Sequence, residues 1–541
     1  MSDWIGALRR GLAEFRRRRV FRVMAVYLVV AWLLVQVADA TFEPLALPEW
    51  SARLLIVLLA LGFAPTVVLA WIYDIGPQGV ARTPLPPPGP TEPPAPADVL
   101  PQSATAAAGV APAEASVAIL PFADLSEDHD QDYFCDGLAE EILNALTRVR
   151  GLRVASRTSS FRFRDGATDT REIGRLLRVA AVMEGSVRKA GDQVRVTAQL
   201  IDAGNGYHLW SRTFDRRLED IFAIQEEIAR KVVELMRPSC GSAPELDLQR
   251  YAPRDMRAYE FYLRGRQLEG RTTAVSWRQA PQMFRRAIAL DPGYAHAHAG
   301  LADALVELSL WRLEPADTVL EEARAAARRA LELAPELAEA HVAFAHTLWL
   351  EDRHDAAAAS FRRALELDPT LYVAHYYFAR HCFARGEFAR ATDLFESAHA
   401  VDPGEFQALS LAVGAAEAEG DRDRTARLAR EALEAALHQV EIDPDNARAH
   451  YMAAALLLRQ GDVEGGRQCV VTALALRPAD FDVLYNAACF HAMAGEADRA
   501  LDLLERAVAT GQGFGDWIER DPELASVRGL PRYRRILACL D

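Results

Sequence analysis

The spacing of apolar and polar residues divides the chain into segments of different kinds. Two stretches near its start, Val23 to Ala38 and Leu54 to Tyr73, carry no charged residue. Residues 116–237 combine short apolar runs and alternating runs, which predict strands, with stretches of helical spacing. From residue 250 onward the spacing is helical, with one apolar face per segment. This pattern predicts several domains of different architecture.

The middle region predicts a small α/β domain. Ser116 to Phe122 is a short apolar run ended by proline, as expected for a buried strand. Val179 to Arg188 and Val194 to Asp202 flank the turn Ala190-Gly191-Asp192 and predict a hairpin. Further strands are expected at 153–155 and 208–214, and helices at 132–148, 169–177 and 218–236. The order β-α-β-α-β-β-β-α predicts a mixed sheet.

Six ordered blocks of this region resemble one known family. They are A-I-L-P-F-A-D-L-S (118–126), Y-F-C-D-G-L-A-E-E-I (133–142), M-E-G-S-V-R (183–188), V-R-V-T-A-Q-L-I-D (194–202), H-L-W-S-R-T-F-D-R (208–216) and D-I-F-A-I-Q (220–225). They resemble the domain shared by FlgO-type proteins and the amino-terminal part of TolB-like proteins. The resemblance implies a bacterial protein in which this domain is joined to tetratricopeptide repeats. It implies no catalytic residue.

The helical region repeats itself. A short motif ending in proline recurs at Pro292, Pro335, Pro369, Pro403, Pro444 and Pro478, at intervals of 43, 34, 34, 41 and 34 residues. Thirty-four residues is the period of the tetratricopeptide repeat. The two long intervals predict a longer loop or helix near 311–315 and near 421–438. Residues 250–512 are therefore predicted to form an all-α solenoid, and residues 513–541 a helical tail that ends it.

A tyrosine series marks a candidate binding groove in this solenoid. Tyr376, Tyr451 and Tyr485 each lie seven residues after a repeat proline, a position of the first helix that usually faces the concave side in tetratricopeptide geometry. His346, Trp349, Arg380 and Arg448 fall on nearby groove positions. Tyrosine and arginine are favoured where proteins bind. The alternative is that some of these side chains only pack between helices.

Other chemistry-bearing residues do not predict a metal, cofactor or catalytic site. His298, His341, His375 and His450 each lie six residues after a repeat proline, so they occupy one structural position four times. Ligands of one ion must converge, and these are spread along the solenoid. The six cysteines are scattered without a C-x-x-C pair, which favours free buried thiols. Only Lys189 and Lys231 are lysines, and neither follows a glycine-rich loop.

The start of the chain predicts a membrane tether. Residues 1–22 carry seven arginines, and residues 23–73 contain the two uncharged stretches. The excess of arginine before the first stretch predicts a cytoplasmic N-terminus and a two-span hairpin. A cleaved signal peptide is the alternative, because Ala38-Asp39-Ala40 has the small-x-small form. Residues 74–115 are proline-rich and predict a semi-rigid linker.

Net charge limits the class of partner. The formal charge of −15 argues against a general nucleic-acid binder, which needs a basic surface. Seven arginines between Arg153 and Arg178, with Phe161 and Phe163 among them, could form an anion-binding or RNA-binding face. In a chain whose cations are nearly all arginine, a solvated face is the preferred interpretation.

These observations together predict a non-enzymatic, membrane-anchored scaffold of the bacterial inner membrane. It has two transmembrane helices, a small α/β domain and a tetratricopeptide solenoid, with its folded domains in the cytoplasm. They would be periplasmic if only one segment spans. The partners expected are other proteins through the groove and the lipid bilayer through residues 23–73. A signalling receptor whose α/β domain binds a small ligand or anion is the alternative function.

Overall fold

The computed structural model describes residues 115–164, 166–236, 249–271, 273–512, 518–519 and 521–538, together with Leu59 and two short strands before them. Those strands, β1 (Tyr73–Gly76) and β2 (Gly79–Arg82), form an antiparallel pair. They belong to one unit, residues 1–106, and the rest of the chain forms a second. The second unit contains the α/β domain and the helical array.

The α/β domain confirms the predicted mixed sheet. Its strands are β3 (Ser116–Ile119), β4 (Ala123–Asp124), β5 (Arg153–Val154), β6 (Ala181–Ala190), β7 (Gln193–Asp202) and β8 (His208–Arg217). Its helical elements are α4 (Asp132–Thr147), α5 (Arg157–Ser160), η1 (Phe161–Phe163), α6 (Thr170–Leu177), η2 (Leu218–Asp220) and α7 (Ile221–Met236). The strand order is β5-β3-β6-β7-β8, with β4 beside β6. Strand β3 pairs in parallel with both β5 and β6, and β4 pairs in parallel with β6. The pairs β6–β7 and β7–β8 are antiparallel.

The predicted hairpin is the longest ladder in this sheet. Strands β6 and β7 pair over their full lengths, from Ala181 opposite Asp202 to Ala190 opposite Gln193. Gly191 in the turn between them has a φ of 58°, a left-handed conformation that favours glycine. The small elements β4, α5 and η1 were not predicted, because segments of two to four residues carry too little periodicity to read.

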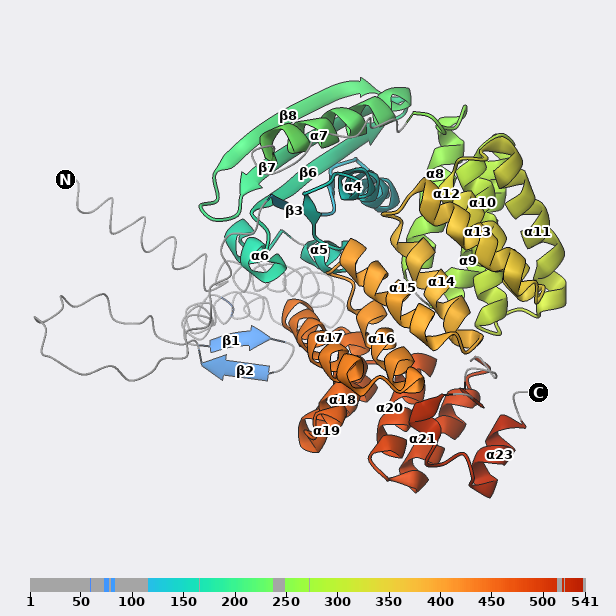
Figure 1. Cartoon of the computed structure of the whole chain (residues 1–541). Coiled ribbons are helices and arrows are strands. Elements are labelled where there is room, and N and C mark those ends of the chain that lie inside the picture. The colour runs from blue at the N-terminus through green and yellow to red at the C-terminus, as the bar shows by residue number, and fades with distance from the viewer. Residues whose placement is uncertain are drawn as a thin grey trace, which may run out of the picture. The chain divides into compact units, whose positions relative to one another are not determined.

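Helices cover the two faces of the sheet unequally (Figure 1). Ala181 and Met183 point into the large core formed with α4 and α7. Val182, between them in sequence, points to the other face and packs with Ile173 of α6 in a smaller cluster. This alternation follows from the two-residue period of a strand.

The remainder of the described chain is a stack of helix pairs, as the repeat predicted. The pairs are α8 (Met256–Gly270) with α9 (Ala274–Leu290), α10 (Ala295–Leu310) with α11 (Ala316–Leu333), α12 (Ala338–Leu350) with α13 (His354–Leu367), α14 (Tyr372–Ala384) with α15 (Phe388–Val401), α16 (Phe406–Glu419) with α17 (Arg422–Ile442), α18 (Ala447–Arg459) with α19 (Val463–Leu476), and α20 (Phe481–Met493) with α21 (Ala497–Val508). The tail adds η4 (Pro522–Leu524) and α23 (Pro531–Leu537).

The repeat positions explain why the pairs stack. Ala357, Phe361 and Ala364 of α13 are fully buried, and so are the matching residues of α15. The Phe361 ring stacks on Phe378 of the next pair, with centroids 5.3 Å apart. Small residues let the paired helices approach, and each phenylalanine fills the space between units.

The two long repeat intervals are mostly filled by longer helices. Helix α17 has 21 residues whereas α13 has 14, which accounts for the seven extra residues of its unit. Helices α10 and α11 have 16 and 18 residues, and a short connection containing Trp311 separates them. These are the two places at which the irregular spacing predicted a longer loop or helix.

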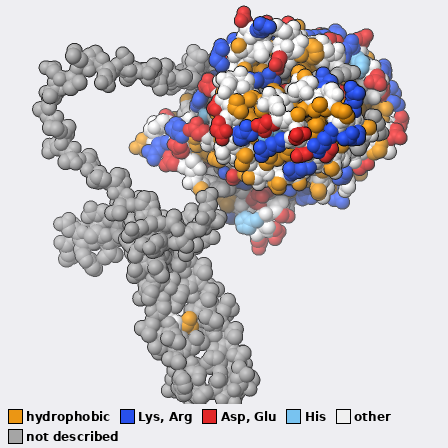
Figure 2. All heavy atoms as spheres, turned by 90° about the horizontal axis from the view of Figure 1, so that it is seen from below, with side chains coloured by type: hydrophobic (Ala, Val, Ile, Leu, Met, Phe, Trp, Pro, Cys, Tyr) orange, Lys and Arg blue, Asp and Glu red, His pale blue; other side chains and the backbone are white. Residues whose placement is uncertain are grey.

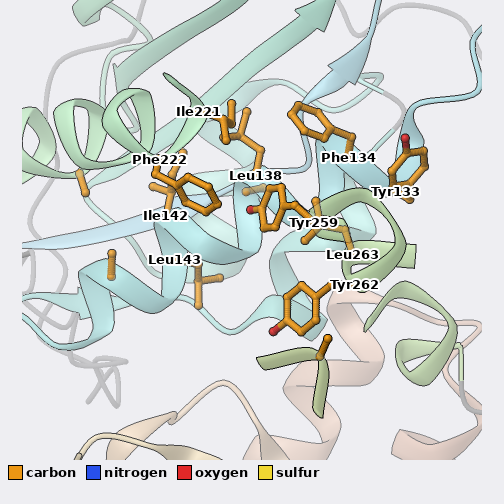
Figure 3. Packing of buried hydrophobic residues seen from close by; sticks show 14 of the residues in the cluster. Tyr133, Phe134, Leu138, Ile142, Leu143, Ile221, Phe222, Tyr259, Tyr262 and Leu263 are labelled. Carbon is orange, nitrogen blue, oxygen red and sulfur yellow. The ribbon is translucent and has the colours of Figure 1, made fainter. Parts of the chain in front are cut away.

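The α/β domain and the first helix pair share one core (Figure 3). Tyr259 of α8 lies against Phe222 of α7, with ring centroids 4.9 Å apart, and its hydroxyl accepts a hydrogen bond of 3.1 Å from Gln225 Nε2. A Cβ atom at Gly137 of α4 would lie 2.5 Å from the Leu263 side chain of α8. The close approach of α4 and α8 therefore depends on glycine at this position.

The expectation of two transmembrane helices is corrected by the structure. Most of residues 23–73 lie outside the described residues. In the part of the chain that the structure describes, no helix has both the length and the apolar character needed to cross a bilayer. Tyr73, the expected end of the second span, begins strand β1 instead.

The fold class is accordingly a small mixed-sheet domain followed by an all-helical array. The predictions of a multi-pass inner-membrane location and of a bilayer partner through residues 23–73 depended on the two transmembrane helices, and they are wrong as well. The reason lies in the pattern itself. An uncharged run indicates burial, but it does not distinguish lipid from a protein interior, and Val23 to Ala38 falls short of the ~20 residues that a span needs.

Candidate functional site

A cavity of about 220 Å³ lies on the inner face of the array, which we define as the surface formed by the first helices of the pairs. Helices α14, α16, α18 and α20 supply its walls. Trp311, from the connection after α10, and Ile518, Asp521, Pro522 and Glu523, from the tail, also line it. Four successive helix pairs therefore contribute to one site.

Five of the seven predicted groove residues meet in this cavity. Tyr376, Arg380, Arg448, Tyr451 and Tyr485 all line it. The repeat period explains this convergence, since residues at equivalent positions of stacked units form a row.

The other two predicted residues, one pair earlier on α12, do not line the cavity. His346 is fully buried, and its Nδ1 lies 2.8 Å from Asp303 Oδ1. The Trp349 ring packs edge-on against His381, with centroids 5.3 Å apart.

The two arginines of the cavity have different surroundings. Arg380 Nη1 lies 4.0 Å from Glu307, and the guanidinium is within 6 Å of the rings of Tyr376 (5.9 Å) and Tyr377 (5.7 Å). Arg448 Nη1 donates a 3.1 Å hydrogen bond to Gln407 Oε1. Burial acts to lower the pKa of Arg448, but nearby Tyr451, Glu405 and Asp482 more than offset it and raise the pKa above its usual value. Both side chains therefore remain cationic.

The three tyrosines combine packing with access to the cavity. Tyr376 is partly exposed, and its ring stacks on Tyr372 with centroids 5.6 Å apart. Tyr451 and Tyr485 are only 5% and 7% exposed. Tyr485 Oη donates a 2.5 Å hydrogen bond to Asp521 Oδ2, so this hydroxyl ties α20 to the tail. Burial raises the pKa of Tyr376, so its phenol is neutral near pH 7.

Asp482 is an acidic group in the cavity wall that the sequence did not single out. Burial raises its pKa to about 6, although Arg448 and Arg380 act in the opposite direction. Near pH 7 it is a carboxylate held in a poorly solvated position. It limits the excess of positive charge that the two arginines create.

The tail closes one end of the cavity through a cluster of polar groups. Asp521 Oδ1 accepts from the backbone N–H of Glu523, and Glu523 accepts a 2.8 Å hydrogen bond from Arg459. Cys489 Sγ lies 3.9 Å from Asp521 Oδ2, and burial raises the pKa of this thiol well above its usual value. Cys489, Asp521 and Glu523 are metal-ligand types brought together, but their atoms serve hydrogen bonds within the fold.

Trp311 brings the end of α10 to the cavity wall beside α20. Its ring packs against Phe481 of α20, with centroids 6.4 Å apart, and Nε1 donates to Glu307 Oε2 at 2.9 Å. Residues 170 positions apart in sequence thus meet across the inner face. The irregular repeat interval marked the segment that holds Trp311, but nothing in the spacing indicated where this side chain would point.

The α/β domain touches the array a second time, next to the cavity. Thr158 Oγ1 of α5 donates a 3.0 Å hydrogen bond to Glu405 Oε2, and Ser159 Oγ donates to Gln439 Oε1 at the same distance. Glu405 caps α16 by accepting from the backbone N–H of Gln407. Gln407 in turn holds Arg448 in the cavity wall.

The fold defines a repeat protein built of stacked helix pairs. Models of the tetratricopeptide repeat match residues 348–413, 421–468 and 452–513. The chain therefore contains tetratricopeptide repeats and is suited to protein interaction. The model that matches residues 113–231 describes the second domain of HilA/YgeH-like transcriptional regulators. This domain is found in place of the FlgO and TolB amino-terminal families that the sequence blocks resembled.

Two curated relatives match part of the chain. A protein of Rhizobium meliloti (strain 1021) named putative adenylate cyclase 3 is 41% identical over 191 residues, covering 35% of this chain and 32% of that protein. The interferon-induced protein with tetratricopeptide repeats 3 of Mus musculus is 31% identical over 105 residues, covering 19% and 24%. The chain thus spans about a third or less of the length of either relative.

Among solved structures, YrrB, described as a tetratricopeptide protein with an unusual peptide-binding site, is 21% identical. The alignment covers 34% of this chain and 91% of YrrB, with a TM-score of 0.25.

Proposed function

We propose that this chain is a non-enzymatic interaction scaffold whose inner cavity binds an extended segment of a partner protein. The observation that carries the proposal is the convergence of Tyr376, Tyr451, Tyr485, Arg380 and Arg448 on one cavity. Tyrosine and arginine dominate the energetics of protein interfaces. We leave His346 and Trp349 out of the proposed site, because they lie away from the cavity.

The size of the cavity supports a segment rather than a folded domain as the occupant. Its volume of about 220 Å³ is below the ~300 Å³ at which pockets for drug-sized ligands begin. Such a space takes one or two side chains, while the main chain of the partner runs along the inner face.

The division into an α/β domain (116–237), an array (250–512) and a tail (513–541) is part of this proposal.

The test is the double variant Tyr376→Ala with Tyr451→Ala, screened against an array of immobilised ten-residue peptides. Peptides that the wild-type chain binds should lose at least about tenfold in affinity, since truncating an interface tyrosine costs about 2 kcal/mol or more at the strongest positions. Tyr207→Ala is the matched control, because Tyr207 is 75% exposed on the α/β domain and far from the cavity in sequence.

A melting curve for each variant separates loss of binding from loss of folding. If the alanine pair does not fold, Tyr376→Phe with Tyr451→Phe keeps both rings and removes only the hydroxyls. Unchanged peptide binding by a folded double variant would reject the cavity as the binding site.

A second candidate function is a signalling protein in which the α/β domain binds a small ligand and the array relays its state. The contacts from Thr158 through Glu405 and Gln407 to Arg448 favour it, because they connect that domain with the cavity wall. The similarity to a protein named putative adenylate cyclase is in keeping with a signalling role. A thermal-shift screen of nucleotides, organic acids and amino acids tests it. Stabilisation by none of these classes would count against the receptor.

A further inference from the structure

Strand β8 is the last strand of the sheet in the α/β domain, and its outer edge is open. Among the described strands it pairs only with β7 (Figure 1). It is ten residues long and contains no proline, and most of its side chains are exposed. A long exposed edge presents a row of unpaired N–H and C=O groups that another strand can join.

The pairing with β7 decides which backbone groups of β8 face this edge. At the end of the ladder, the N–H of Leu218 donates a 2.8 Å hydrogen bond to the carbonyl of Asp192. Bonded and non-bonded pairs alternate along an antiparallel ladder, so every second residue counted back from Leu218 bonds to β7. The residues between them, Ser211, Thr213 and Asp215, direct their N–H and C=O groups to the open edge.

The charges of β8 restrict how a second copy of the same strand can join it. Two copies related by a twofold axis form a closed dimer, in which one residue of β8 faces itself across the axis. An axis beside Arg212 or Asp215 places like charges directly opposite, which destabilises a strand pair. An axis beside Phe214 does the same, because it places Arg212 opposite Arg216.

An axis beside Thr213 avoids these conflicts. It places Ser211 opposite Asp215, so that the hydroxyl of one copy donates to the carboxylate of the other. The three residues with outward-facing backbone groups then form about six hydrogen bonds between the copies. An axis beside Ser211 would instead move the pairing onto Leu209, which the irregularity in the ladder leaves without a partner on β7.

The side chains on the opposite face of β8 fit the same register. It sets Arg216 opposite Trp210 and Arg212 opposite Phe214, so each arginine meets an aromatic ring. Within the chain, the Arg212 guanidinium already lies 5.0 Å from the centre of the Phe214 ring. Both arginines pair with Glu227 of α7, so each brings its counter-charge to the interface.

We propose that two copies of this chain pair through β8 about a twofold axis beside Thr213, which joins their sheets into one. The inference goes beyond the proposed function, because it concerns another surface and holds whether or not the cavity binds a peptide. A dimer would carry two cavities, and a partner with two suitable segments would bind it more tightly than it binds one chain.

Sedimentation velocity of the full chain over a dilution series tests the dimer. Thr213→Asp and Thr213→Lys should each weaken self-association at least about tenfold, because like charges then face each other across the axis. A mixture of the two variants should restore dimerisation, since the facing charges are then opposite. Only a twofold register centred on this residue predicts both results.

Thr197→Asp and Thr197→Lys are the matched controls. Thr197 lies opposite Thr213 on β7, on the same face of the sheet. The two copies of Thr197 would be about 14 Å apart across the interface, which is three strand spacings. This separation exceeds the Debye length of about 8 Å at physiological salt, so neither control should change self-association.

Three results would overturn the proposal. One is a wild-type chain that stays monomeric, and slow hydrogen exchange at residues 211–215 in that monomer would assign the edge to another segment of the same chain. Another is a dimer that neither charge at Thr213 weakens, which would place the interface elsewhere. The third is loss of the dimer in both variants without recovery in the mixture.

Melting curves establish that each variant is folded. If a charged variant at Thr213 does not fold, Ser211→Asp takes its place, because it sets a carboxylate opposite Asp215 in the same register. It should also weaken the dimer, and an unchanged dimer would again count against pairing through β8.

Discussion

The histidines show how one residue type acquires different roles within the array. His298, His341, His375 and His450 each place Nε2 between 2.9 and 3.1 Å from the carbonyl oxygen of their repeat proline. The Nε2–H donates to a carbonyl in the connection between two helix pairs, which gives that carbonyl a hydrogen-bond partner. The packing role predicted for this position is thereby explained, since each ring fastens a connection between pairs.

His381 has no such bond, and its burial makes a prediction about pH. It is 1% exposed, its two ring nitrogens lack hydrogen-bond partners, and burial lowers its pKa to about 4, with His354 and Arg385 adding to the effect and Glu387 opposing it. An unfolded histidine titrates near 6.5, so between these values the unfolded state binds the proton. The contribution of His381 to stability therefore falls as pH drops from about 7 to about 4, by up to about 1.4 kcal/mol per unit.

We expect His381→Phe to remove this loss, because phenylalanine fills a similar space without a titrating group. Urea denaturation should show that the free energy of unfolding of the variant exceeds that of the wild type by more at pH 5 than at pH 7.5. An equal difference at the two pH values would contradict the assignment.

At the scale of the element, glycines decide how closely helices approach. Gly265 of α8 and Gly300 of α10 flank the same aromatic ring, Phe284 of α9: a Cβ at either glycine would lie 2.6 or 2.7 Å from it. In contrast, a Cβ at Gly414 of α16 would meet nothing within 4 Å. Packing against Phe284 therefore requires a residue without a side chain at Gly265, whereas no neighbouring atom imposes this requirement at Gly414.

The variant Gly265→Ala should destabilise the chain. Overpacking costs about 1–3 kcal/mol, which exceeds the gain of about 1 kcal/mol that alanine brings to a helix. Gly414→Ala, the matched control, should keep that gain and raise the melting temperature. Free energies of unfolding from chemical denaturation check both, and a stabilised Gly265→Ala would show that α8 and α9 can move apart at little cost.

In the second unit, two contacts of unlike kind are among those that attach the α/β domain to the array. One is the apolar core shared by α4, α7 and α8. The other, at α17, includes the ion pairs Arg162–Asp443 (2.7 Å), Arg175–Glu441 (3.3 Å) and Arg178–Glu434 (3.5 Å). Six of the seven arginines considered as an RNA-binding face form ion pairs within the chain, three of them at this contact. Figure 2 shows cationic and anionic side chains interspersed over the visible face.

High salt should weaken the ionic contact at α17 and leave the apolar contact at α8 unchanged. Exposed ion pairs weaken when the Debye length falls to about 3 Å near 1 M salt, whereas apolar burial does not. Hydrogen exchange of the full chain in high salt should therefore speed up at residues 157–163 and leave α4 and α8 protected. Equal changes at both contacts, or none at 157–163, would show that ion pairs do not hold the second one.

The sequence by itself determined the local elements and the repeat. Helical and strand periods depend on neighbouring residues, so the β6–β7 hairpin, the stacked helix pairs and the row of Tyr376, Tyr451 and Tyr485 could all be predicted. The tertiary structure decided what depends on distant residues. It placed Trp311 against Phe481, tied Tyr485 to Asp521, brought Asp482 beside Arg448, and withdrew His346 into the core. Uncharged runs misled the membrane prediction, because hydropathy reports a preference for burial and not the medium that provides it.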